Sequence, residues 1–142
     1  MPAASNTVTI NRPIGDVFAY VADGLNGPSW RSGILDIAHA SGEGLGAVYR
    51  QGVKGPGGRR IDADYAITAY DPPHRLAFKP IAGPVQPTGE YRLAETAGGT
   101  SITFALEAQL GGVAKLLMGG AVQKTMDAEV ANLAKLKAVL EG

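Results

Sequence analysis

The sequence places phenol hydroxyls at alternate positions of segments that have the pattern of β-strands. Tyr49, Tyr65 and Tyr91 each stand at an apolar position of such a segment, and Gln51 shares the face of Tyr49. A phenol buried without a hydrogen-bond partner costs about 1 to 3 kcal/mol, so each hydroxyl needs an acceptor, a water or a ligand group. These side chains are therefore the best candidates for polar anchors, although packing in a core explains each of them equally well.

Paired carboxylates offer acid-base chemistry, and Asp62 and Asp64 share one face of a strand as residues i and i+2. They lie beside Arg60 and opposite the apolar residues of that strand, so we expect them on a solvated outer surface. Glu90 and Arg92 have the same pattern and carry the same expectation. The acidic residues of the strands therefore favour surface ion pairs over a catalytic pair.

Histidine, serine and glycine motifs offer no stronger alternative. His39 and His74 lack the spacing and the neighbouring carboxylates of a metal site, and the chain has no cysteine. No serine stands in the G-x-S-x-G context of an activated nucleophile. The glycine-rich run 55–58 lacks the GK[ST] ending of a phosphate loop, so we expect a hairpin tip there. The sequence predicts neither a metal site nor a cofactor.

The composition restricts the partners. The 142-residue chain has the length of one domain, and its 13 basic and 13 acidic residues give a formal net charge of zero. No global field therefore recruits nucleic acid or an anionic membrane. The lack of cysteine fits a reducing compartment, and residues 1–6 have neither the basic nor the apolar part of a signal peptide. We expect a cytoplasmic protein with one domain over 1–142, no nucleic-acid partner and no integral membrane segment.

An amphipathic helix is predicted over the last quarter of the chain, Gly112 to Leu140. Apolar residues recur there at three- and four-residue spacing, while polar residues such as Glu129 fill much of the remaining circumference. At ~1.5 Å per residue the helix is about 40 Å long, and its apolar face needs an equally long partner. The pair Gly119-Gly120 predicts an interruption or bend, read either as a curve around the partner, which we favour, or as a hinge at a cavity mouth.

The rest of the chain alternates like a series of strands. A strand over Thr7–Ile10 precedes a short helix from Pro13 to Val21 and a loop or second short helix carrying Trp30, which we expect at a helix-sheet junction. Further alternating segments lie at 34–39, 47–53, 59–70, 75–79, 89–93 and 101–107. They predict about seven strands, joined mostly as a meander with one wet and one dry face.

A twisted antiparallel sheet of this size curls, and the terminal helix is the cover that its dry face requires. We therefore predict an α+β fold in which a seven-stranded curved antiparallel sheet grips a long C-terminal helix, with two short helices after the first strand. The space between sheet and helix is either filled by side chains or open to a ligand.

Four stretches carry a family resemblance: RPIGDVFAYVAD, PSW, YDPPHRLAF and GTSITFALEA. Together with the order of elements they resemble the helix-grip superfamily (SRPBCC), which includes START-type lipid-transfer domains, pollen allergens of the same fold and bacterial polyketide cyclase/dehydratase-like proteins. The resemblance covers nearly the whole chain. It implies an elongated apolar cavity in which some relatives catalyse cyclisation, dehydration or hydrolysis and others carry or sense a ligand. No catalytic motif is invariant in the superfamily, so no residue receives a role in this way.

Two functions follow from this resemblance. The preferred one is a carrier or sensor of a hydrophobic or aromatic small molecule, lipids included. Its candidate lining residues are Trp30, Tyr49, Gln51, Tyr65, Phe78, Tyr91, Phe104, Leu117, Met118 and Met126. The alternative is a polyketide cyclase/dehydratase-like enzyme, in which a tyrosine hydroxyl, helped by Gln51 or by an arginine such as Arg50, protonates an enolised polyketone.

The carrier is preferred because tyrosines are the only titratable groups on the predicted inward face of the sheet. A cavity that contains Asp64, Glu90 or His74 would reverse this preference. A third function, a partner-binding or homodimerising module, would follow from a solid interior with a pocket well below the ~300 Å³ of typical ligand sites.

Overall fold

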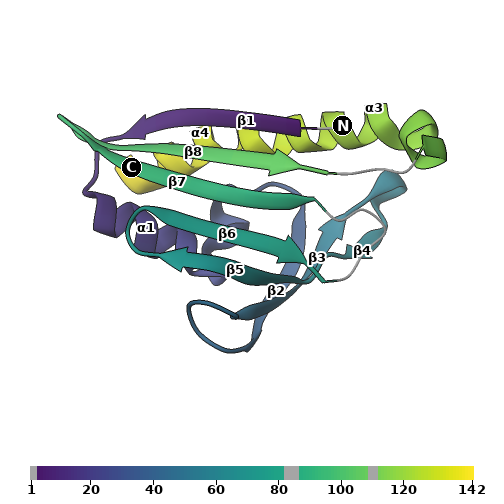
Figure 1. The fold of residues 1–142 in the computed structure, drawn as a ribbon, viewed down its shortest axis with the longest axis horizontal. Helices are drawn as coiled ribbons and strands as arrows, with labels where there is room; N and C mark the ends of the chain where they lie inside the picture. The colour runs from purple at the N-terminus through teal and green to yellow at the C-terminus, as the bar shows by residue number, and fades with distance from the viewer. Residues whose placement is uncertain (1–2, 82–86, 109–111) are drawn as a thin grey trace.

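The chain forms a curled antiparallel sheet with helices along its concave side (Figure 1). The computed structural model describes residues 3–81, 87–108 and 112–142, with the side chains of 56, 112–119 and 121–122 outside the description. The strands are β1 (Ala3–Ile10), β2 (Ile34–Ser41), β3 (Val48–Lys54), β4 (Arg60–Asp62), β5 (Tyr65–Asp71), β6 (Arg75–Pro80), β7 (Thr88–Thr96) and β8 (Gly99–Glu107). The helices are α1 (Ile14–Ala22), the 3-10 helix η1 (Gly24–Asn26), α2 (Gly27–Trp30), the 3-10 turn η2 (Pro56–Gly58), α3 (Gly112–Ala131) and α4 (Leu133–Glu141).

One sheet contains every strand of the described residues, in the order β1-β8-β7-β6-β5-β3-β2, with β4 paired to β3. All pairings are antiparallel, and the strands from β2 to β8 follow one another as a meander before β1 closes the far side against β8. The predicted α+β class, the curved sheet and the two short helices after the first strand are confirmed.

The segment predicted as one strand over 59–70 is two strands, β4 and β5. Between them the side chain of Asp64 replaces a backbone acceptor, because its Oδ1 accepts a hydrogen bond of 3.1 Å from the backbone N–H of Gln51. The N–H of Ala63 in turn donates to the carbonyl of Gln51 at 2.9 Å. The prediction of a continuous strand is therefore wrong, since the side chain of Asp64 interrupts the ladder and accepts from the N–H of Gln51, while the backbone of Ala63 donates to the carbonyl of Gln51.

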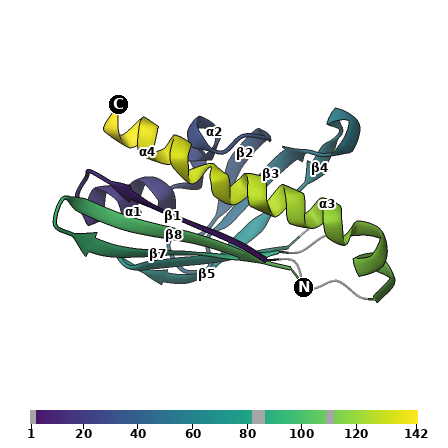
Figure 2. The same ribbon diagram turned by 90° about the horizontal axis from the view of Figure 1, so that it is seen from above.

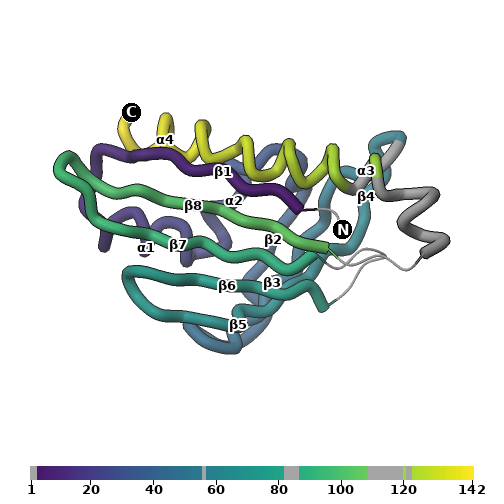
Figure 3. The backbone as a smooth tube through the Cα atoms, turned by 45° about the horizontal axis from the view of Figure 1, so that its top comes forward, coloured from purple at the N-terminus to yellow at the C-terminus, as the bar shows by residue number. Residues whose placement is uncertain are grey.

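The terminal helices α3 and α4 run alongside β1, as both the view from above (Figure 2) and the backbone trace (Figure 3) show. The helix is assigned continuously through Gly119-Gly120, so this pair does not interrupt it, whereas the predicted bend at the pair stays a prediction. The break between the two helices falls at Asn132. Long-range partners explain the break. The side chain of Asn6 donates to the carbonyl of Val130 at 3.1 Å, and the hydroxyl of Ser32 donates to Oδ1 of the buried Asn132 at 3.2 Å.

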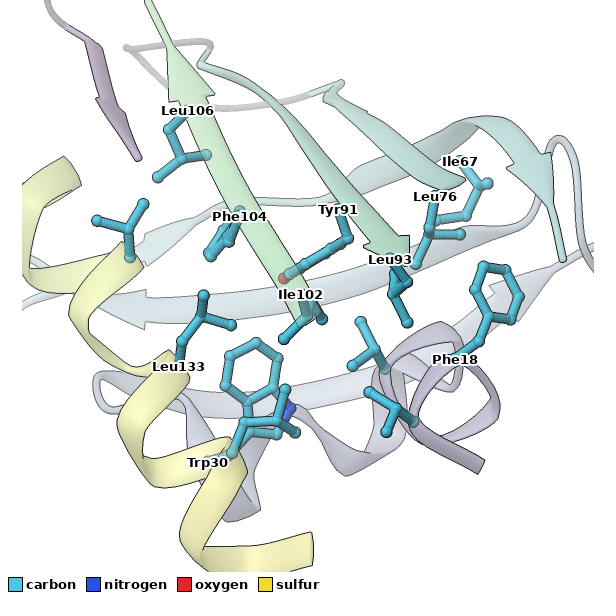
Figure 4. Packing of buried hydrophobic residues seen from close by; sticks show 14 of the residues in the cluster. Phe18, Trp30, Ile67, Leu76, Tyr91, Leu93, Ile102, Phe104, Leu106 and Leu133 are labelled. Carbon is cyan, nitrogen blue, oxygen red and sulfur yellow. The ribbon is translucent and has the colours of Figure 1, made fainter. Parts of the chain in front are cut away.

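The core lies where the C-terminal half of this helical pair meets the concave face of the sheet (Figure 4). Leu133 and Leu136 of α4 are fully buried, as are Ile102 and Phe104 of β8. Trp30, only 3 % exposed, packs between helix and sheet, which is the junction at which the sequence places it. The tight packing at this end leaves any open space toward the other end of the sheet.

A pair of valines tests how much the helix cover contributes. Val130 is 5 % exposed and Val139 is 41 % exposed. We expect Val130→Ala to lower the free energy of unfolding by about 2 kcal/mol, because two buried methyl groups are lost and a small cavity remains. Val139→Ala removes the same atoms from the surface and should stay within about 0.5 kcal/mol of the wild type. Urea denaturation measures both; equal losses would mean that α3 does not bury this face.

Candidate functional site

A cavity of about 430 Å³ lies between the concave face of the sheet and the helices α2 and α3. This volume is within the usual range of small-molecule sites, which argues against a solid interior. Most of the wall is apolar. The described lining includes Val21, Trp30, Arg31, Gln51, Ile61, Ala63, Tyr65, Ile67, Leu76, Phe78, Tyr91, Leu106, Met126 and Glu129.

The predicted lining residues divide into three groups. Six of them do line the cavity: Trp30, Gln51, Tyr65, Phe78, Tyr91 and Met126. Tyr49 and Phe104 are buried in the core but are not part of the lining. The side chains of Leu117 and Met118 lie outside the described residues.

A row of aromatic rings crosses the sheet from β3 to β8, and its middle members Tyr65, Phe78 and Tyr91 line the cavity. Tyr49 stacks on Tyr65 with 5.3 Å between ring centroids, and Tyr91 stacks on Phe104 at 4.4 Å. Each stacked pair occupies directly opposite positions of neighbouring strands. Phe78 lies between the two pairs, 5.6 Å from Tyr65 and 6.0 Å from Tyr91. The strand register therefore builds a continuous aromatic surface from residues far apart in the sequence.

The helix η1 approaches this row closely at Gly24, which is buried and lines the cavity. A Cβ atom at this position would lie 2.5 Å from the hydroxyl oxygen of Tyr65 and 2.8 Å from the ring of Tyr49. Both distances are shorter than a carbon atom allows. A glycine is therefore required for η1 to lie against the two tyrosines.

The hydroxyls of Tyr65 and Tyr91 make no hydrogen bond to any residue whose side chain the structure describes. Burial raises the pKa of Tyr65 to about 12, opposed in part by the positive charge of Arg31. Burial likewise raises the pKa of Tyr91 far above its ordinary value, again opposed by Arg31. Both phenols are protonated at neutral pH and available as donors to a ligand.

An ion pair in the cavity wall is the functional feature that sequence reasoning missed. Arg31 follows α2 directly, and its Nε donates to Oε1 of Glu129 on α3 at 2.5 Å. The two side chains are 15 % and 23 % exposed. Desolvation lowers the pKa of Arg31, but the charge and hydrogen bond of Glu129, together with the nearby Tyr91 and Tyr65, raise the pKa overall. The polar side of the predicted helix contained Glu129, but nothing in the sequence linked it to a residue 98 positions away.

The side chain of Gln51 is 5 % exposed, and its Oε1 has no hydrogen-bond partner in the described structure. Buried polar atoms of native proteins are nearly always paired, so an orphaned acceptor in a cavity wall needs a ligand or a water. The Oε1 of Gln51 thus joins the two phenol hydroxyls as a polar atom without a partner among the described side chains.

Of the other candidate residues, only Asp62 reaches this cavity. Arg50 is exposed, so its proposed help to a tyrosine inside the cavity is wrong. Asp62 lies at the cavity rim, exposed and paired with Arg60, while Asp64 and His74 do not line the cavity. Among the described residues, no group of three or more histidines and carboxylates could hold a metal ion.

A second, wider depression of about 770 Å³ lies on the outer face of the sheet. Glu90 belongs to it and accepts a hydrogen bond of 2.7 Å from Nε of Arg75, besides pairing with Arg92. Desolvation raises the pKa of Glu90, but the two arginines together lower it. The depression carries ion pairs on a solvated surface, as the sequence predicts for Glu90, and lacks the helical cover that encloses the inner cavity.

A curled sheet closed by a terminal helix over an apolar cavity defines the helix-grip class of proteins. The family model described as polyketide cyclase/dehydrase and lipid transport matches residues 1–141, and the chain belongs to this family. A comparison with curated proteins finds no match. None of the helices among the described residues is both long and apolar enough to cross a membrane.

Solved structures share this fold at low sequence identity. TTHA0849 from Thermus thermophilus has a TM-score of 0.80 and 17% identity, with 96% of this chain and 95% of that chain covered. The KanY protein has a TM-score of 0.77 and 20% identity, with 99% and 97% covered. The di-domain ARO/CYC StfQ of the steffimycin biosynthetic pathway has a TM-score of 0.80 and 14% identity, with 96% of this chain and 49% of that chain covered.

The buried phenol of Tyr65 should appear in the alkaline stability of the protein. Tyrosine in the unfolded chain has a pKa of about 10, whereas burial raises the pKa of Tyr65 to about 12 in the folded state. The folded state therefore favours the neutral phenol, whose contribution is complete below about pH 10 and is lost as the pH rises toward 12.

Between pH 9 and 12 we expect the wild type to lose about 2 kcal/mol more unfolding free energy than the Tyr65→Phe variant. Urea denaturation at a series of pH values measures the difference. Tyr70→Phe, which removes a phenol that is 39 % exposed, is the matched control. Parallel curves for the wild type and Tyr65→Phe would contradict the burial of this hydroxyl.

Proposed function

We propose that the protein binds a hydrophobic or aromatic small molecule between the sheet and the C-terminal helix, as a carrier or sensor. The observation that carries this proposal is the cavity of about 430 Å³ with a mainly apolar wall and few polar groups. Ligand sites of small molecules have this composition, because apolar surface supplies affinity and a few polar groups set orientation.

The polar groups of the wall support the same function. The hydroxyls of Tyr65 and Tyr91 and the Oε1 of Gln51 have no partner among the described residues. A buried acceptor left unpaired, as Oε1 of Gln51 is among the described residues, costs about 1 to 3 kcal/mol, which a complementary ligand group recovers. The aromatic row from Tyr65 to Phe78 and Tyr91 offers ring faces and edges to a planar or hydrophobic ligand.

The lack of cysteine supports a cytoplasmic site of action, since it fits a reducing compartment. Lipids belong to the proposed range of ligands because the cavity wall is mostly apolar. Native mass spectrometry of protein purified from its own host would detect a molecule that copurifies with it.

A filled cavity should abolish this binding. Ala63 is half-buried and lines the cavity, whereas Ala94 is exposed on β7. We expect wild-type protein to bind the neutral fluorescent probe N-phenyl-1-naphthylamine, and Ala63→Trp to weaken that binding at least about tenfold, because the indole occupies ligand volume. Ala94→Trp adds the same side chain to the outer face and should bind as the wild type does.

Probe fluorescence titration measures these affinities, and circular dichroism checks that both variants are folded. Equal binding by the two tryptophan variants would place the probe elsewhere on the protein. Failure of the folded wild type to bind the probe or any copurifying molecule would contradict the proposal.

Cyclisation or dehydration of a polyketone is the second candidate function. The protonated hydroxyls of Tyr65 and Tyr91 are suitable donors to an enolised polyketone, and Arg31 supplies the positive charge that Arg50 cannot. StfQ, a structure of this fold, is described as an ARO/CYC protein of a biosynthetic pathway. Conversion of a poly-β-ketone by the wild type, and its loss in Tyr65→Phe with probe binding retained, would select the enzyme over the carrier.

A further inference from the structure

The ion pair between Arg31 and Glu129 is the one charged pair in the described cavity wall whose two side chains are both largely buried. The other charged residues of the wall, Asp23, Lys54 and Asp62, are exposed. A ligand placed in the cavity therefore meets one inner positive charge and one inner negative charge, both held away from water.

Arg31 has hydrogen-bond donors that no described residue accepts from. A guanidinium carries five N–H donors, and the described residues accept from Arg31 only at Nε, through Oε1 of Glu129. Neither of its Nη groups has an acceptor among those residues. Neither Nη atom is among the fully buried atoms without a partner, so both keep accessible surface. Since Arg31 lines the cavity, its Nη groups can donate to a ligand or to water there.

The neighbours of Arg31 are further donors. Trp30 precedes it and lies edge-on to Tyr91 at 6.2 Å, and all three residues line the same cavity. Tyr91 and Tyr65 both interact electrostatically with the guanidinium, and both hydroxyls lack a partner among the described side chains. Guanidinium N–H groups and two phenol hydroxyls therefore lie near one another in the wall of an apolar space.

We propose that this end of the cavity is an anion-binding subsite, and that the ligand is an aliphatic or aromatic carboxylic acid whose carboxylate binds the Nη groups of Arg31 and a tyrosine hydroxyl. This inference rests on the proposed function and adds the chemical class of the ligand. A carboxylate only accepts hydrogen bonds, and its two oxygens match the planar fork of a guanidinium. The apolar body of the acid occupies the space above the aromatic row.

Glu129 acts as an internal competitor in this arrangement. In the empty protein it compensates the charge of Arg31, which would otherwise be buried without a partner. When a carboxylate enters the cavity, the charge of Glu129 repels it, and both carboxylates compete for the guanidinium of Arg31. Removing the charge of Glu129 should therefore strengthen the binding of an anion, whereas removing Arg31 should weaken it.

The experiment compares each acid with its methyl ester, which has nearly the same shape without the charge. Decanoic acid with methyl decanoate and 2-naphthoic acid with methyl 2-naphthoate are titrated at pH 8 by displacement of N-phenyl-1-naphthylamine. The proteins are the wild type, Arg31→Gln, Arg31→Lys and Glu129→Gln. Circular dichroism and the melting temperature report whether each variant is folded.

For the acids we expect Arg31→Gln to weaken binding by about tenfold or more and Glu129→Gln to strengthen it severalfold. Arg31→Lys, which keeps the charge without the fork, should lie between the wild type and Arg31→Gln. The affinities of the esters should change much less. Acid affinity should thus fall when Arg31 is changed and rise when Glu129 is changed. An ion pair that only holds α2 to α3 would not produce opposite changes.

Equal binding of acid and ester by the wild type would overturn the carboxylate subsite and leave the apolar cavity in place. Parallel weakening of acid and ester in both Arg31→Gln and Glu129→Gln would also overturn it, because the pair would then only hold α2 to α3. A bound probe that no acid displaces would overturn the carboxylic acid as the ligand class, whereas failure of the wild type to bind the probe would overturn the proposed function itself. If Arg31→Gln fails to fold, Arg31→Lys and Glu129→Gln still test whether acid affinity falls with one change and rises with the other.

Discussion

The concave face of the sheet must be covered, and the burial of that apolar face by the terminal helices is the interaction on which the rest of the structure depends. Leu133 and Leu136 close one end, where they meet Ile102 and Phe104 of β8. Burying side chains of this size contributes about 1.5 to 3 kcal/mol each, so this end is the stable part of the molecule. At the other end the curled sheet encloses more space than the side chains of the helix fill, and this unfilled space is the cavity.

Several hydrogen bonds fix this closure at points where the chain would otherwise continue regularly. The side chain of Asn6 on β1 donates to the carbonyl of Val130, and Ser32 donates to the side chain of Asn132, so the helical pair is attached to the first strand and to the segment after α2. On the sheet, the side chain of Asp64 separates β4 from β5 and holds the backbone of Gln51. Local irregularities thus set the position of the cavity wall.

Alternation of apolar and polar residues was sufficient to predict the sheet, its inward face and the covering helix, because these depend on local period and on burial. The breaks at Ala63-Asp64 and at Asn132 were not predictable, since each depends on a partner that only the folded chain brings near. The same holds for Arg31 and Glu129. Six of the predicted lining residues do face the cavity, but phasing alone does not distinguish a lining residue from Tyr49 or Phe104, which lie one layer deeper.

Trp30 is the only tryptophan of the chain, and it stands in the cavity wall edge-on to Tyr91. Its indole is excited at wavelengths at which phenols hardly absorb, so its emission comes from one known location. A molecule that enters the space beside the indole changes the polarity around the ring and can quench its fluorescence. Both effects change the emission of Trp30. The protein thus carries an intrinsic optical reporter of occupancy, usable without any label.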